Sequence, residues 1–147
     1  MLPLHKILYP TDFSEASYEA LKVANEVAVH HSAELLVVHV TPPVPMAAAA
    51  TGYSAIAEME RSEEISLQEL IKERIPKELH ARQIVTLGEA AQEIIRIAEQ
   101  ERVDLIVIGT HGQTGWRRVV FGSVAEKVVR FALCPVLTIR APHEKTN

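Results

Sequence analysis

The sequence of 147 residues contains one cysteine, Cys134, so no disulfide can form within the chain. A lone cysteine is typical of a reducing compartment, and residues 1–6 lack the layout of a signal peptide. No apolar run approaches the roughly 20 residues of a membrane span. Positive charge is not in excess, because the net charge is -4, which disfavours a nucleic-acid binder with a broad basic face. These absences predict a cytoplasmic protein without membrane or nucleic-acid partners.

Several motifs of nucleotide-processing and hydrolytic enzymes are missing as well. No Gly-x-x-x-x-Gly-Lys-(Ser/Thr) sequence is present, which excludes a P-loop NTPase. No Gly-x-Gly-x-x-Gly follows the first predicted strand, which disfavours a dinucleotide dehydrogenase. The serine-hydrolase elbow Gly-x-Ser-x-Gly, the zinc motif His-Glu-x-x-His and paired cysteines are also missing. These absences leave a hydrolase or a zinc protein without support in the sequence.

What the chain does contain is an alternation of strand-like and helix-like segments. Five aliphatic runs are strand candidates, at residues 4–9, 34–40, 83–87, 103–108 and 135–139. Apolar residues at helical spacing lie between them, and Ser14 is the predicted N-cap of the first helix. We expect a single α/β domain over 1–147, with an open parallel sheet covered by helices on both faces. Residues 41–54 are predicted to form a mobile loop and 141–147 a tail.

Two of the predicted strand ends carry unusual residues. The fourth strand is followed by Gly-Thr-His-Gly at 109–112, and Gly122-Ser123 opens the last helix after nine further residues. Glycines at such a place let a phosphate approach backbone N–H groups at the positive end of a helix dipole. The first strand is followed by Pro-Thr-Asp at 10–12. If strands one and four are neighbours, both ends flank one crevice, which is where ligands bind in such folds.

Simpler roles for these residues remain open at this point. Gly109 and Gly112 could serve only tight turns. Asp12 could serve only as a helix cap, in competition with Ser14, although in the crevice it would bind a ribose or help hold a metal ion. Ser123 is predicted to cap the last helix whether or not it contacts a phosphate.

The spacing of these glycines is similar to the ATP-binding signature of the universal stress protein family. The resemblance extends over essentially the whole chain, because other segments also resemble that family, in the same order. These are residues 6–14, 88–95, 104–109, 122–125 and 134–137. The resemblance implies an α/β fold of Rossmann-like type with strand order 3-2-1-4-5, usually dimeric through the last strand.

The resemblance also implies which residues would contact the adenosine part of ATP. Pro10 and Thr11 would shape the adenine wall, and Asp12 would contact the ribose or the metal region. Val40, at the end of the second strand, would offer backbone groups to the adenine edge.

The remaining implied contacts belong to the phosphates. Gly109, Gly112, Gly122 and Ser123 would line them, with Val124 adding a backbone donor. All four small residues of the signature are present, which favours binding of ATP with Mg²⁺. The contacts to adenine do not separate ATP from AMP or a cyclic nucleotide.

No residue in the sequence stands out as a general base or nucleophile held by an orienting partner. We therefore predict a nucleotide-dependent switch or adaptor in a stress response, acting on a protein partner, with little or no hydrolysis. One alternative is a nucleotide-independent dimeric adaptor, in which the last strand, 136–139, pairs across a two-fold axis and so covers its exposed edge. Another is an enzyme, either a slow ATPase or a nucleotidyl transferase.

Overall fold

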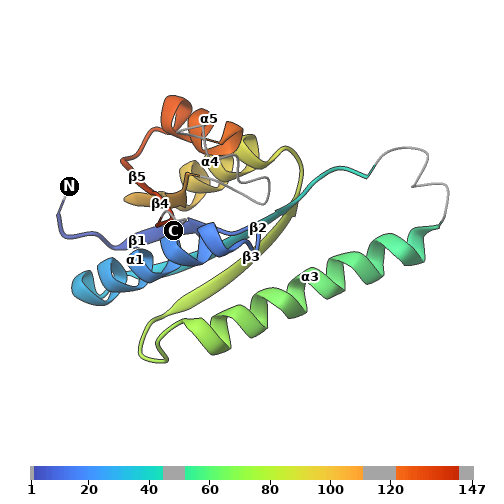
Figure 1. Ribbon diagram of the computed structural model, residues 1–147, viewed down its shortest axis with the longest axis horizontal. Coiled ribbons are helices and arrows are strands. Elements are labelled where there is room, and N and C mark those ends of the chain that lie inside the picture. Colours follow the sequence, from blue (N-terminus) through green and yellow to red (C-terminus); the bar gives the residue numbers. More distant parts are fainter. Residues whose placement is uncertain (1, 45–51, 111–121, 143–147) are drawn as a thin grey trace, which may run out of the picture.

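Five parallel strands form the sheet of the protein, in the order β3-β2-β1-β4-β5. The computed structural model describes residues 2–44, 52–110 and 122–142, and Figure 1 shows the arrangement of its helices and strands. In chain order the elements are β1 (Lys6–Pro10), α1 (Glu15–His31), β2 (Glu34–Thr41), α3 (Tyr53–Arg74), β3 (Ala81–Leu87), α4 (Ala90–Glu101), β4 (Leu105–Gly109), α5 (Ser123–Phe131) and β5 (Val136–Ile139). The predicted α/β class, parallel sheet and strand order are confirmed. Among the described helices, none is long and apolar enough to cross a membrane.

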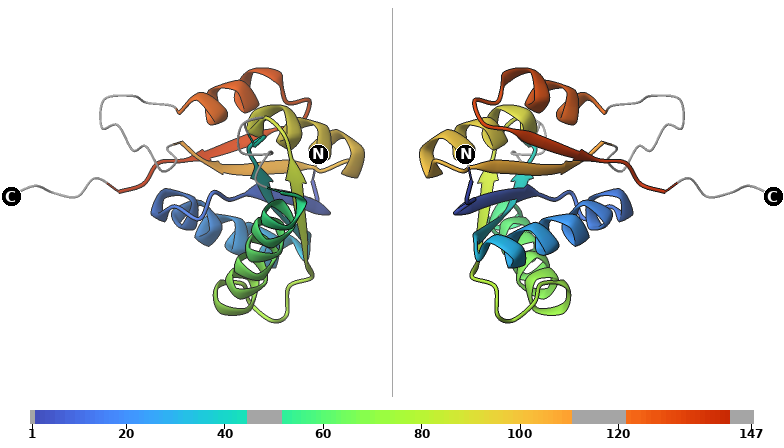
Figure 2. Two further views of the ribbon diagram at one scale, coloured as in Figure 1. Left: turned by 90° about the vertical axis from the view of Figure 1, so that its right-hand side faces the viewer. Right: turned by 90° about the vertical axis from the view of Figure 1, so that its left-hand side faces the viewer.

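Helices cover both faces of this sheet, as the two views in Figure 2 show. α1 and α3 lie on one face, and α4 and α5 lie on the other. The side chains of β2 alternate between the two layers. Leu35 and Val37 belong to the cluster on the side of α1 and α3, whereas Leu36 and Val38 belong to the cluster under α4 and α5. Residues 35–38 form an unbroken aliphatic run because both faces of the strand are buried there.

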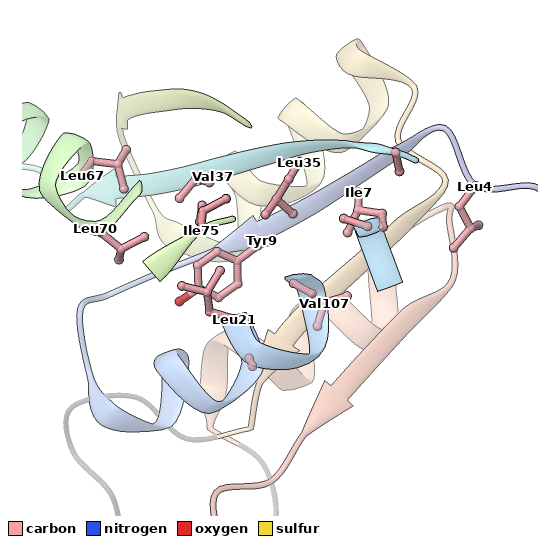
Figure 3. Close-up of a cluster of buried hydrophobic side chains, with 14 residues drawn as sticks. Leu4, Ile7, Tyr9, Leu21, Leu35, Val37, Leu67, Leu70, Ile75 and Val107 are labelled. Atoms are coloured by element: carbon pink, nitrogen blue, oxygen red, sulfur yellow. The ribbon is translucent and has the colours of Figure 1, made fainter. Parts of the chain in front are cut away.

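α3 is attached to the sheet through its C-terminal half. Leu67 and Leu70 pack in one buried cluster with Tyr9 and Val37, which Figure 3 shows in close-up. Residues 57–62 are all exposed, and in Figure 1 this end of the helix extends past the strands. The N-terminal half of α3 therefore gains little from apolar burial.

The predicted boundaries hold at some elements and are wrong at others. Ser14 is the N-cap of α1, as predicted, and its hydroxyl accepts the Ser17 backbone N–H at 3.2 Å. The fourth strand begins at Leu105 and not at residue 103, because α4 ends in a left-handed residue, Arg102, and the chain turns before it enters the sheet.

The predicted loop 41–54 is wrong at both ends. Thr41 is the last residue of β2 and pairs with Leu87 of β3, so the strand is longer than its aliphatic run. At the other end, α3 begins at Tyr53. Residues 45–51 of this loop, and residues 143–147 of the predicted tail, lie outside the described part of the chain.

Candidate functional site

The candidate site lies where β1 and β4 separate. These neighbouring strands are paired only in their first halves, and the last pair joins Leu8 and Ile106. Beyond this pair, the end of β1 is hydrogen-bonded only to β2, and the end of β4 only to β5, among the described residues. The Thr11 N–H donates to the carbonyl oxygen of Val38 in β2 at 2.8 Å, and the Thr110 N–H donates to the last residue of β5 at 2.9 Å. The two ends diverge at the point where strand order reverses, which opens a crevice.

A pocket of about 260 Å³ occupies this crevice. Eight of the nine predicted site residues line it, namely Pro10, Thr11, Asp12, Val40, Gly109, Gly122, Ser123 and Val124. The ninth, Gly112, lies outside the described residues. Residues from both halves of the sequence are thus brought to one cavity.

Further residues line the pocket that the sequence did not single out. They are Ser17, Val38, Ala90, Ile94, Ile108, Thr110 and Ala125. Val38 could have been found from strand periodicity, because it lies two residues before Val40 and on the same face. Ile94 belongs to the apolar stripe of α4, where sequence alone does not separate a pocket wall from a core.

Thr11 is fixed in the pocket wall by hydrogen bonds on its side chain and its backbone. Its hydroxyl lies 3.0 Å from the Ser17 hydroxyl and accepts the Phe13 N–H at 3.0 Å. Its carbonyl oxygen lies 2.8 Å from Nδ1 of His39. Together with the bond from its N–H to β2, these contacts hold Thr11 from three sides.

Asp12 and Ser14 have separate roles at the start of α1. The Oδ1 atom of Asp12 accepts the Ser14 N–H at 3.0 Å, which closes a turn, while Ser14 itself caps the helix. The competition for the cap that the sequence left open is therefore resolved in favour of Ser14. Asp12 also lines the pocket, and it is the only ionisable residue that does so in the described part of the chain.

Two helices direct their N-termini at the pocket, and they differ in capping. At α4, the Glu89 carboxylate accepts hydrogen bonds from the Gln92 and Ala91 N–H groups. These bonds, of which the one from Gln92 has the larger effect, hold the pKa of Glu89 below its usual range. At α5, the N-cap is Gly122, which has no side chain to cap the helix. Among the described residues no side chain caps the first turn of α5, whereas α4 carries its own negative charge.

This geometry corrects the prediction for Ser123. It is the first residue of α5 and not its N-cap, because Gly122 takes the extended backbone conformation that a cap requires. Gly109 is the last residue of β4 rather than part of a tight turn, and no left-handed φ requires glycine there. Both glycines contribute backbone to the pocket lining.

A parallel sheet covered on both faces, with a pocket where the strand order reverses, defines an α/β protein of Rossmann-like architecture. The family model of the universal stress protein family matches residues 3–140. The chain belongs to this family.

Relatives of known sequence and structure agree with this assignment. Universal stress protein MJ0531 of Methanocaldococcus jannaschii is 34% identical over 145 residues, which covers 95% of this chain and 84% of that protein. The solved structure of protein MJ0577 from the same organism has a TM-score of 0.84 at 30% identity and covers 96% of this chain and 99% of that one. A universal stress protein from Archaeoglobus fulgidus in complex with dAMP has a TM-score of 0.61 and covers 94% and 98%; at 24% identity this likeness concerns the fold.

Proposed function

We propose that the protein binds ATP, with Mg²⁺, in this pocket and acts as a nucleotide-dependent switch or adaptor in a stress response, with little or no hydrolysis. The observation that carries the proposal is the combination, in one cavity, of an apolar wall and a helix N-terminus without a side-chain cap. An adenine nucleotide has the same two parts, a flat base and a chain of phosphates. A related fold is known in complex with dAMP, which shares the base.

The apolar wall suits the adenine ring. Val38, Ile94 and Ile108 line the pocket from β2, α4 and β4. The Val38 carbonyl points toward β1, where it accepts the Thr11 N–H. Because backbone groups in a parallel strand alternate in direction, the N–H and C=O of Val40 point to the same side, beyond the end of β1. This arrangement would present a donor and an acceptor to the edge of the base.

The other end of the pocket suits phosphates. The N–H groups of Ser123 and Val124 belong to the first turn of α5, which carries the positive end of the helix dipole. Gly122 has no Cβ to keep a phosphate away. Asp12 lines the same pocket and would accept a ribose hydroxyl or help hold Mg²⁺, an ion that prefers oxygen ligands.

The chemistry of the described pocket residues supports binding without turnover. Phosphoryl transfer requires an oriented acceptor and charge stabilisation at the transferred group. In the described ranges the pocket offers one carboxylate, in Asp12, and no histidine, lysine or arginine. A general base oriented by a second ionisable group is thus not part of this lining.

Two measurements test the binding. Purified protein is denatured and the supernatant is analysed for ATP, ADP and AMP, and the protein is then titrated with Mg-ATP while its melting temperature is recorded. A ligand at about 100 times its Kd adds roughly 2.7 kcal/mol to the free energy of unfolding, so a clear rise in Tm is expected. Parallel titrations with AMP and cAMP show which phosphate tail is preferred. If no nucleotide is released and none shifts the melting temperature, the nucleotide-independent adaptor is favoured.

We further propose a homodimer through β5. This strand is at the edge of the sheet, where its outer backbone groups lack a neighbour within the sheet. Apolar side chains are exposed in this strand and in the segment before it: Leu137 of β5 is 38% exposed, and Phe131 and Leu133 are 58% and 84% exposed. Sedimentation velocity should show a dimer for the wild type and a monomer for Leu137→Lys, because a charge on the edge opposes pairing.

The compartment remains a proposal as well, and we place the protein in the cytoplasm. Cys134 is partly buried, and burial raises the pKa of its thiol. It therefore has the environment of a structural residue rather than a redox-active one.

A further inference from the structure

His39 of β2 contacts both the pocket wall, at Thr11, and helix α3, at Glu63. Its neighbours in β2, Val38 and Val40, line the pocket on the side of α4 and α5. Because side chains alternate along a strand, His39 lies on the opposite face, on the side of α3. It is 9% exposed, and the ring of Phe13 packs beside it with centroids 4.7 Å apart.

Both ring nitrogens of His39 lie near oxygen atoms. Nδ1 lies 2.8 Å from the carbonyl oxygen of Thr11, and since a carbonyl only accepts, Nδ1 must donate. Nε2 lies 3.5 Å from Oε1 of Glu63 in α3, and the two form an ion pair when the ring is protonated, since both nitrogens then donate. The second oxygen of this carboxylate accepts a hydrogen bond from the Thr41 hydroxyl. One buried side chain thus contacts the pocket wall at one end and α3 at the other.

The contact with Thr11 fixes a peptide unit of the pocket. The Thr11 carbonyl and the Asp12 N–H belong to one planar peptide, in which they point in opposite directions. The bond to Nδ1 therefore sets the orientation of the peptide that joins two pocket-lining residues. A ligand that requires one orientation of this peptide favours the bound position of the His39 ring.

The contact with Glu63 matters because of its place along α3. The apolar attachment of the helix begins at Leu67, and residues 57–62 are exposed. Glu63 lies between these two parts and links the helix to the end of β2, through His39 and Thr41. Loss of this link leaves the N-terminal half of α3 without a described polar contact to the sheet.

We propose that His39 is a positioning residue that couples the docking of α3, through Glu63, to nucleotide binding at the Thr11–Asp12 peptide. This inference rests on the proposed function and names the element that responds to it. Nucleotide in the pocket favours the docked N-terminal half of α3, and by linkage the docked helix favours nucleotide. Binding of nucleotide in the pocket thereby changes the docking of α3 on the opposite face of the sheet.

The test compares Glu63→Ala with Glu64→Ala, the same change at the adjacent, exposed residue. Affinity for Mg-ATP is measured by calorimetry, and amide exchange in residues 55–66 is followed with and without Mg-ATP. We expect Glu63→Ala to weaken binding about fivefold and Glu64→Ala to stay within about twofold of wild type. ATP should slow exchange in 55–66 of the wild type and of Glu64→Ala, but not of Glu63→Ala.

A second variant separates coupling from general stability. His39→Asn keeps an amide donor near the position of Nδ1 but is too short to reach Glu63. It should weaken binding as Glu63→Ala does, and the double variant should bind no worse than either single one. Additive losses, equal affinities of Glu63→Ala and Glu64→Ala, or exchange in 55–66 that ignores ATP would each overturn the coupling. Failure of the wild type to bind ATP would overturn both the proposed function and the coupling. Binding of ATP by the wild type together with any of the three results above would overturn the coupling alone.

Discussion

A Cβ atom built on Gly109 would lie 3.1 Å from the carbonyl oxygen of Ala16. The end of β4 and the start of α1 are therefore packed backbone against backbone at this point. The neighbour is a main-chain atom in the first turn of a helix, which cannot rotate away as a side chain can. The packing of α1 thus favours a glycine here, because an added methyl would push this backbone back by a few tenths of an ångström, whether or not a ligand approaches from the pocket.

Gly109→Ala should destabilise the protein by about 1–3 kcal/mol, the usual cost of an extra methyl in a packed region. Urea unfolding of the variant beside the wild type measures this difference. Ala132→Val, which adds volume outside the pocket lining, is a suitable comparison. A Gly109→Ala variant as stable as the wild type would mean that α1 can shift, and that the glycine is not explained by this contact.

Gly122→Val should fold normally but lose most of its affinity for ATP, by at least about tenfold if one phosphate contact of roughly 1.4 kcal/mol is lost. The backbone at Gly122 has φ -69° and ψ 160°, which a valine can adopt, so the side chain blocks the approach to the α5 N-terminus without straining the backbone. Calorimetric titration with Mg-ATP gives the affinity.

Ser123→Ala is the companion variant at this helix start. It removes a hydroxyl and leaves the backbone N–H groups in place, so its affinity should change far less than that of Gly122→Val. Equal losses in both variants would indicate that side chains, and not the α5 backbone, hold the phosphates.

Asp104→Ala should lower the free energy of unfolding by about 1–3 kcal/mol, the usual range for hydrogen bonds to a charged group. One oxygen of this carboxylate accepts the N–H groups of His5 and Lys6, at 2.7 and 2.9 Å, and so holds the start of β1 beside β4. Chemical denaturation is the measurement. Asp104→Asn retains an oxygen acceptor and should lose less.

Acid should remove the contribution of the ion-pair cluster around Arg82. This guanidinium bonds Glu101 and Glu34, and the Arg82 bond lowers the pKa of Glu101 below its usual value of 4.5. Because the folded-state pKa is the lower one, the contribution is fully present above pH 4.5 and is lost as the pH falls through the folded pKa. Free energies of unfolding between pH 3 and pH 7 should therefore fall more steeply, at about pH 4.5 and below, for the wild type than for Arg82→Gln. Parallel curves would show that the pair contributes nothing, as for many partly exposed pairs.

Much of the fold could be predicted because the strands are rich in aliphatic residues, such as residues 35–38 of β2, and because they alternate with segments of helical spacing. The ends of the elements were harder. Gly122 and Ser123 are both good cap residues by type, and only the backbone conformation shows that Gly122 is the cap. Thr41 looked like the start of a loop, and its place in β2 depends on pairing with Leu87, a contact that local sequence does not contain.

The candidate site was predictable where a residue type is unusual for its position. Pro10 and Gly109 interrupt the pattern at strand ends, and both line the pocket. Ile94 does not stand out, since an apolar wall and an apolar core have the same sequence pattern. His39 was missed for a different reason, because its contacts, to Thr11 and Glu63, join residues that are distant along the chain.

The separation of β1 and β4 after Leu8 and Ile106 has a consequence for how such proteins diversify. The crevice arises from the paths of two main chains and not from any particular large side chain. Substitution of a lining residue such as Val38 or Ile94 changes the shape and polarity of the cavity but leaves its location intact. A lineage with this sheet can therefore exchange one small ligand for another, or lose its ligand, by point substitutions that leave the architecture unchanged.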